Sequence, residues 1–341
     1  MYDAILLVGF GGPEKPADVL PFLENVLRGK RVPHERMLEV AEHYEMFGGS
    51  SPINEQHRVL LRALIDELNT HGPQLPVYWG NRNWYPLLGE AIEEMARDGV
   101  RRGLAFVTSA FSSYSGCRQY LEDIQRAREE VGAAAPPIDK LRAFYNHPGF
   151  IEPMAERVAS ALEQVPAERR AAAPLIFTAH SIPLAMAAGC RYEAQLREAC
   201  RLVAQRVGRA EWTLVYQSRS GSPAHPWLEP DVCDHLAQLG QGGAVRDAVI
   251  APIGFLSDHM EVIYDLDVEA QAVCEHFGIA MVRALLVGSH PRFVRMIREL
   301  ILERIEEHAP RLALGDDGPS PDVCPPDCCP QRVGSGVRGA G

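Results

Sequence analysis

The chain has 341 residues, with 34 Lys and Arg against 45 Asp and Glu, so its formal net charge is −11 at pH 7. Its 46% hydrophobic and 23% charged residues are typical of a globular protein and exclude a disordered or fibrous chain. The length of the chain is enough for about two domains. The acidic balance argues against binding to nucleic acid, and no apolar stretch approaches the ~20 residues of an integral membrane span.

Short apolar runs alternate with longer amphipathic segments along most of the chain. The runs are β-rich and end in Gly, Pro, Ser or Asn, so we expect buried strands at 4–10, 76–81, 103–111, 174–181, 212–218 and 248–255. Apolar residues at three- and four-residue spacing predict helices at 90–100, 120–131, 193–207 and 267–277. Strands that alternate with helices predict an α/β protein with parallel sheets covered on both faces.

The two halves of the chain resemble each other weakly. Residues 101–113 and 246–258 share a charged start, an apolar strand and a Phe near its end, while 4–13 and 174–183 both run from a strand into a turn closed by Pro. We therefore expect two similar domains that meet near 146–150. Ligands of such sheets bind at the carboxyl ends of the strands, so we look for chemistry there.

The C-terminal segment differs from the rest. After an amphipathic helix that ends near Leu312, residues 313–341 are too rich in Gly and Pro to form helix or sheet, and we expect them to need a ligand for order. The segment holds Cys324, Cys328 and Cys329 among eight cysteines in all. With no export signal at the N-terminus we expect a reducing cytoplasm, where clustered thiols indicate metal or redox chemistry.

Two motifs resemble known sites but lack essential parts. Gly9, Gly11 and Gly12 follow a strand, but Glu14 takes the position of the third glycine of a dinucleotide fingerprint, where its charge would oppose a pyrophosphate. The H-x-E at His259 suggests a zinc deaminase, which also needs P-C-x-x-C. Here the tail cysteines are spaced C-x3-C-C, so the deaminase is kept only as an alternative.

A histidine and a row of acids are brought to one predicted sheet edge. His180 ends one strand, and strand 248–255 leads into Asp258, His259 and Glu261. Asp265 and Glu269 follow Glu261 at i+4 and i+8.

In an α-helix, side chains four residues apart are rotated by about 40° from one another around the helix axis, so the row would wind around the helix. An underwound π-type segment would align these side chains more closely along one face. A solvated acidic face is the simple alternative. Because the row begins beside a histidine, we favour a path of oxygen ligands that conducts a divalent cation.

A neutral imidazole that faces a metal path suits a reaction in which a cation replaces protons on a ligand. An aromatic and basic wall would bind that ligand. The candidates for this wall are Phe10, Tyr114, Tyr120, Tyr192, Trp227, Arg28 and Arg82.

The chain resembles the ferrochelatases, which insert ferrous iron into a porphyrin. The resemblance covers about residues 1–312 and rests on the motifs LLVGFGGPE, GGSSPINEQ, GNRNWYP, EAIEEMARDGVRR, TAHSIP, YQSRSG with PWL, and SDHMEVIYDLD. It implies a chelatase fold of two Rossmann-like domains, each with a parallel four-stranded sheet, at 1–148 and 149–290. The porphyrin would bind in a cleft between them, and the first domain would carry a porphyrin-binding lip. The helix of 291–312 would pack back on the first domain, and 313–341 would form a cysteine-containing tail.

The resemblance also implies roles for single residues. His180 would take pyrrole protons or receive iron, with Glu261 as its partner across the macrocycle. Phe10 would lie under the macrocycle. The inner-to-outer metal path would consist of Asp258, His259, Asp265 and Glu269, and the expected substrate contacts are Phe10, Arg28, Ser51, Tyr120 and Trp227, of which Arg28 and Ser51 would hold propionates.

Three features depart from some relatives. Position 10 is Phe where related enzymes carry Tyr, so no phenolate is available to iron. Asn83 stands where some relatives have His, and the segment 29–47 is polar where membrane-bound relatives have an apolar lip.

The tail resembles that of actinobacterial ferrochelatases with a 2Fe-2S cluster. Cys324, Cys328 and Cys329 would be three of its ligands, and Cys117 the fourth. A structural zinc on the same thiolates is the alternative.

The resemblance favours coproporphyrin III as substrate and coproheme as product, with protoporphyrin IX as the alternative. A downstream enzyme of heme biosynthesis is a possible partner. A noncatalytic iron-sulfur protein is the rival from another functional class.

Overall fold

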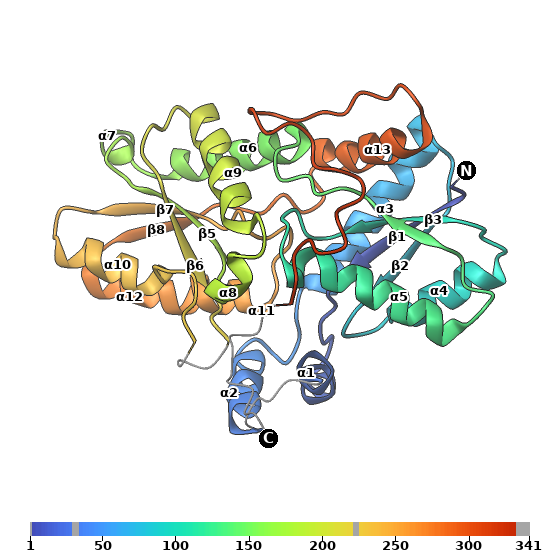
Figure 1. Cartoon of the computed structure of the whole chain (residues 1–341). Helices are drawn as coiled ribbons and strands as arrows, with labels where there is room; N and C mark the ends of the chain where they lie inside the picture. Colours follow the sequence, from blue (N-terminus) through green and yellow to red (C-terminus); the bar gives the residue numbers. More distant parts are fainter. Residues whose placement is uncertain (1, 29–33, 221–224, 332–341) are drawn as a thin grey trace, which may run out of the picture.

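The computed structural model describes residues 2–28, 34–220 and 225–331. It contains two α/β units side by side, each built on a four-stranded parallel sheet (Figure 1). The strand order is β2-β1-β3-β4 in the first sheet and β6-β5-β7-β8 in the second. The predicted fold class is confirmed. The strands are β1 (Ala4–Gly9), β2 (Val77–Asn81), β3 (Gly103–Val107), β4 (Ile138–Lys140), β5 (Leu175–His180), β6 (Thr213–Gln217), β7 (Asp247–Ala251) and β8 (Ala280–Arg283).

Helices cover both faces of each sheet and form an arm beside them. The first unit and its arm contain α1 (Val19–Leu27), α2 (His34–Glu45), α3 (Ile53–His71), α4 (Leu88–Arg97) and α5 (Gln119–Val131), with a 3-10 turn η1 (Pro16–Asp18) and a π-helix η2 (Tyr114–Arg118). The rest of the chain contains α6 (Pro148–Gln164), α7 (Ala167–Arg170), α8 (Leu184–Ala187), α9 (Tyr192–Arg206), α10 (Val232–Gln241), α11 (Met260–Val262), a second π-helix η3 (Ile263–Ala270), α12 (Gln271–Phe277) and α13 (Pro291–Ile305).

The strands are apolar throughout because both faces of each sheet are buried. In β1, Ile5 and Leu7 face one hydrophobic cluster, and Leu6 and Val8 face another. The first of these clusters also contains Phe177 of β5, so residues of both sheets share one continuous core.

The weak internal similarity corresponds to equivalent strands. β1 and β5 are both second in their sheets, and β3 and β7 are both third. The apolar runs indicated six strands, and the two that they missed, β4 and β8, lie at the sheet edges. Both are short and mostly half-buried, so they carry little apolar signal.

The last helix and the tail bind the two units together. α13 packs on α3 and α6, and the tail returns along the middle of the molecule (Figure 1). Its residues up to 331 form no helix or strand, as predicted. Contacts of the protein itself hold the tail, however: Leu314 N donates to Asn146 O at 2.8 Å, and Asp317 accepts from Tyr145 at 2.9 Å and from Arg191 at 2.8 Å.

Within the described residues, no helix is both long enough and apolar enough to cross a membrane.

Candidate active site

His180 is the last residue of β5, at the carboxyl edge of the second sheet. Its Nδ1 lies 2.5 Å from the carbonyl oxygen of Ser181. A carbonyl can only accept, so this contact assigns the proton to Nδ1 and leaves the lone pair of Nε2 free in the neutral ring. The side chain is 33% exposed, and Nε2 can therefore accept a proton or bind a cation from the solvent side.

Glu261 lies directly beside His180. The helix α11, which follows the β7 loop, carries Glu261, and its Oε2 is 3.8 Å from His180 Nε2. The expectation that the two face each other across a macrocycle is wrong. A flat ring needs about 3.5 Å of van der Waals clearance on each side, or about 7 Å in all. Both groups must therefore act from one side of any planar ligand.

The acidic row continues from α11 into the π-helix η3. The wider turn that could align the acids is thus present, and it carries Asp265 and Glu269. Burial, together with the nearby carboxylates of Glu261 and Glu269, raises the pKa of Asp265 to about 7, although hydrogen bonds from Ser218 and Gln217 oppose the shift. Burial also raises the pKa of Glu269. The row is a set of carboxylates that repel one another, which a cation would relieve.

The two residues before the row have structural partners. Asp258 Oδ1 accepts from Arg283 Nη1 at 2.8 Å, and the same guanidinium binds Asp267. One oxygen of Asp258 is therefore already paired. Burial lowers the pKa of His259, whose ring packs edge-on against Phe255 at 5.2 Å. A neutral imidazole is thereby favoured at His259.

The arm of α1 and α2 presents aromatic rings to this region. Phe10, which follows β1 and is 37% exposed, packs edge-on to Phe22 at 6.3 Å, and Phe22 does the same to Tyr44 and Trp84. Burial raises the pKa of Tyr44, and the charge of Glu261 raises it further, so this aromatic cluster lies near the acidic row.

A second contact joins the arm to the row. The ring of His43 in α2 stacks on Tyr264 of η3, with centroids 3.6 Å apart. The arm and η3 therefore meet face to face.

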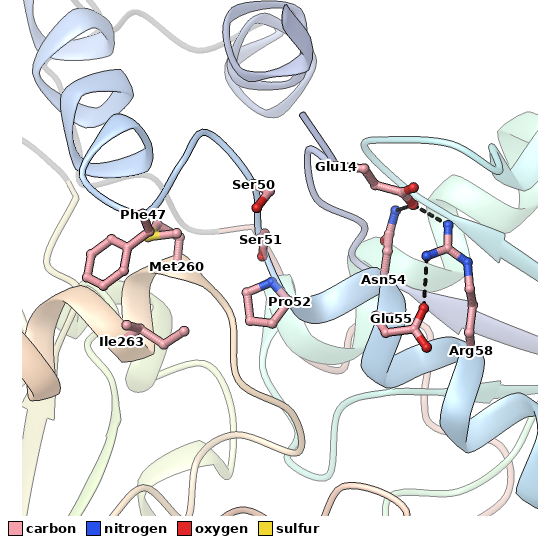
Figure 2. Close-up of a pocket in the computed structure, with 10 residues that line it drawn as sticks. All are labelled: Glu14, Phe47, Ser50, Ser51, Pro52, Asn54, Glu55, Arg58, Met260 and Ile263. Atoms are coloured by element: carbon pink, nitrogen blue, oxygen red, sulfur yellow. Dashed lines mark hydrogen bonds and ion pairs between the residues drawn. The ribbon is translucent and has the colours of Figure 1, made fainter. Parts of the chain in front are cut away.

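A pocket of about 450 Å³ opens between the loop before α3 and the start of the acidic row (Figure 2). Ser51 lines it from one side, and Met260 and Ile263, which flank Glu261, line it from the other. Arg58 pairs with Glu14 and Glu55 in the same pocket, so its charge is already balanced. His180 and Glu261 do not line this pocket. Glu261 follows Met260 directly in the chain, so the pocket adjoins the start of the acidic row.

The remaining predicted contacts are scattered. Arg28 is exposed at the end of α1 and donates to Asn25 at 2.5 Å. Trp227 pairs through its backbone with Pro183, in the loop that follows His180, and its indole Nε1 is buried with no hydrogen-bond partner in the described part of the chain.

Tyr120 is not part of an exposed wall, contrary to expectation. It is 5% exposed in the core of the first unit, beneath the guanidinium of Arg82 at 4.4 Å. Tyr114 and Tyr192 are buried as well.

The four predicted cluster thiols gather where the tail meets η2. Arg118, next to Cys117, donates to the carbonyls of Pro326 and Cys328, the latter at 2.9 Å. The sulfurs of Cys328 and Cys329 are 3.4 Å apart. Burial raises the pKa of Cys324 to about 11 and also that of Cys329, and Cys328 and Cys117 add to both shifts.

No metal centre is preformed by these or other groups in the described ranges. Nowhere in residues 2–28, 34–220 and 225–331 do three His, Cys, Asp or Glu side chains converge as ligands of one ion. The closed zinc site that a deaminase would need at His259 is thus not found there.

The sequence did not single out two side chains that orient Asp265. Gln217, fully buried at the end of β6, accepts from Thr178 at 2.7 Å and donates to Asp265 at 3.3 Å, and Ser218 donates to the same oxygen. The signal was available, since both polar residues end the predicted strand 212–218 at the edge where His180 lies.

The ferrochelatase family model matches residues 2–305. Among similar proteins, a ferrochelatase of Rhodopirellula baltica is 57% identical over 96% of this chain and 93% of its own length. A coproporphyrin III ferrochelatase of Streptomyces griseus is 51% identical over 97% of this chain and 94% of its own. Among solved structures, SirB of Bacillus subtilis with Fe³⁺ has a TM-score of 0.54 at 14% identity, covering 91% of this chain and 99% of its own, which indicates a shared fold.

Proposed function

The chain belongs to the ferrochelatase family, and on that premise we propose that it inserts ferrous iron into coproporphyrin III to form coproheme. The observation that carries the proposal is the pair of His180 and Glu261, 3.8 Å apart at the carboxyl edge of the second sheet, with the acidic row behind it. A general base and a metal path thus reach one exposed point. Iron insertion needs both, because the cation must displace two pyrrole protons.

His180 is the proposed acceptor of one of the two pyrrole protons, and the Glu261 carboxylate is the proposed acceptor of the other. Its Nδ1 is committed to the Ser181 carbonyl, so the free Nε2 is the atom that takes the proton. The resulting imidazolium would lie 3.8 Å from the Glu261 carboxylate, which stabilises the positive charge. We therefore place both residues on the same side of the macrocycle.

Glu261, Asp265 and Glu269 are the proposed path of the ferrous substrate. Oxygen ligands that bind weakly and in sequence suit transfer better than a closed site does. Gln217 and Ser218 both donate to Oδ2 of Asp265, which leaves Oδ1 for the cation. We also include His259, as a neutral imidazole, at the inner end of this proposed metal path. The Arg283 pair suggests that Asp258 chiefly supports the loop.

Phe10, Ser51 and Trp227 are the proposed contacts of the porphyrin. Phe10 offers an exposed ring for stacking, the Ser51 hydroxyl in the pocket offers a donor to a carboxylate, and Trp227 would contact the porphyrin through its half-buried ring. Arg28 would reach a propionate only after leaving Asn25. Coproporphyrin III carries four propionates against two in protoporphyrin IX, and the names of the relatives favour the former.

The test is an anaerobic assay with ferrous iron and either porphyrin, followed by absorbance. We expect faster insertion into coproporphyrin III. His180→Ala should reduce turnover at least 100-fold while porphyrin binding, measured by fluorescence quenching, persists. The control His308→Ala removes an exposed imidazole far along the chain from the site and should leave the rate unchanged. Retained turnover in His180→Ala would refute the assignment.

We further propose that Cys117, Cys324, Cys328 and Cys329 hold a 2Fe-2S cluster. Two thiolates on one tetrahedral metal, at bonds of about 2.3 Å, lie about 3.8 Å apart, and the 3.4 Å between Cys328 and Cys329 is close to this. Cys328 and Cys117 add to the raised pKa of Cys324 and of Cys329, a cost that cationic iron would relieve. A bound cluster would cross-link the tail to η2.

Anaerobic purification with iron and sulfide analysis tests the cluster. Cys117→Ser should abolish the visible absorbance, and Cys190→Ser, a half-buried thiol beside the same tail, should preserve it. Loss only in Cys190→Ser would reassign the fourth ligand. Stoichiometric zinc without sulfide would instead support the structural zinc alternative.

We also propose that the protein acts in the cytoplasm, where cysteines stay reduced; its eight cysteines, all within the described residues, form no disulfide. The downstream enzyme that would take up the product stays a prediction.

A further inference from the structure

Tyr192 lies behind the active site and not on its wall. The residue opens α9, is 6% exposed, and its hydroxyl donates to the backbone carbonyl of His180 at 3.0 Å. The hydroxyl is buried with this carbonyl as its partner, and an unmade hydrogen bond there would be costly. The contact therefore fixes the backbone of the residue that carries the imidazole.

The sheet itself leaves that carbonyl unpaired. Successive carbonyls of a strand point to opposite edges, so the carbonyls of Thr178 and His180 face the same edge, towards β7. Thr178 O accepts from Gly254, but β7 has already ended at Ala251, whose partner in β5 is Phe177. His180 thus extends beyond its neighbouring strand on this side, and the hydroxyl of Tyr192 takes the place of a strand donor.

The turn that carries Tyr192 is anchored independently. Gln195, 3% exposed on the same turn, accepts from Ser112 N at 2.7 Å and donates to Ser112 Oγ at 3.1 Å. The ring of Tyr192 also packs edge-on against Phe111 of the first unit, with centroids 6.2 Å apart. The phenol is therefore a fixed support, because its position is set by contacts that do not involve β5.

We propose that Tyr192 is a positioning residue for iron insertion, which holds the end of β5 so that Nε2 of His180 remains against Glu261. The inference rests on the proposed function. Its removal affects the alignment of the two reacting groups and leaves the porphyrin contacts intact, because Tyr192 touches none of Phe10, Ser51 or Trp227 in the described hydrogen bonds and ring contacts.

The experiment compares Tyr192→Phe with Tyr216→Phe. Tyr216 is also buried, in β6 beside β5, but its hydroxyl has no hydrogen-bond partner among the described residues. The control therefore removes the same oxygen atom without the loss of a hydrogen bond. Turnover is expressed per site that binds porphyrin stoichiometrically, which removes any contribution from unfolded protein.

We expect kcat of Tyr192→Phe to fall about five-fold, the factor that corresponds to one ordinary hydrogen bond, with unchanged KM for porphyrin and iron. Tyr216→Phe should match the wild-type protein in all three constants. Equal kcat in the two variants, or a change confined to KM, would overturn the positioning role while the wild-type rate still supports iron insertion. A wild-type protein without turnover would overturn the proposed function and this inference with it.

Discussion

Replacement of Asp265 by Asn is expected to stabilise the fold while it impairs the metal path. The buried carboxyl has a folded pKa of about 7 against an ordinary value of 3.8, chiefly because burial penalises its charge. Between these two pH values the folded state binds a proton that the unfolded state has released, so the stability of the wild-type protein falls as pH rises through this window. Asn has the shape of Asp but no charge, so the variant does not carry the cost of burying an ionised carboxylate.

The expected magnitude follows from the same two pKa values. By linkage, the raised pKa of Asp265 lowers the unfolding free energy of the wild-type protein by about 4 kcal/mol at pH 8 and by about 1.5 to 2 kcal/mol at pH 5. Asp265→Asn should therefore gain about 2 to 3 kcal/mol more in unfolding free energy at pH 8 than at pH 5, relative to the wild-type protein. Iron insertion by the variant should fall at both pH values, because one oxygen ligand of the proposed path is lost.

Urea denaturation at the two pH values measures the difference. Asp66→Asn is the matched control, since Asp66 is exposed on α3 and forms no ion pair in the described part of the chain. If the two variants show the same pH dependence of the unfolding free energy, or if Asp265→Asn is less stable at pH 8, the reasoning from burial is refuted.

Three further substitutions probe other contacts. Glu303→Gln leaves the guanidinium of Arg142 buried without its counter-charge and should cost about 3 to 5 kcal/mol in the unfolding free energy, measured by urea denaturation; a loss below 1 kcal/mol would contradict this. Arg118→Ala removes the donors to the tail carbonyls and should lower the cluster content of purified protein, measured as iron and sulfide per chain, whereas full occupancy would count against the anchoring role. Gly9→Ala would bring a methyl group within 2.6 Å of the buried ring of His57 and should lower the melting temperature by several degrees, so an unchanged melting temperature would show that the ring can shift.

The sequence predicted the parallel α/β class and most of the core strands because a strand buried on both faces is apolar along its whole length. It missed β4 and β8 for the converse reason, since edge strands of three or four half-buried residues lack this pattern. It also brought His180 and Glu261 to one sheet edge. Their separation of 3.8 Å depends on how the loop after β7 turns into α11, and no local pattern encodes that path.

The aromatic residues show where residue type misleads. Their residue type makes Tyr120 and Tyr192 candidates for a ligand wall, yet each belongs to the apolar stripe of its helix. Tyr192 shares its face with Leu196, Ala199 and Val203 at helical spacing, and all are buried. The same periodicity that predicted the helices could thus have assigned both rings to the core.

The hydrophobic cluster shared by the two sheets makes their unfolding interdependent. If one half were cut away, apolar side chains such as Leu7 and Phe177 would lose packing partners and face water. We therefore expect that neither half folds on its own. Calorimetry of the intact chain should show a single endotherm whose van't Hoff and calorimetric enthalpies agree.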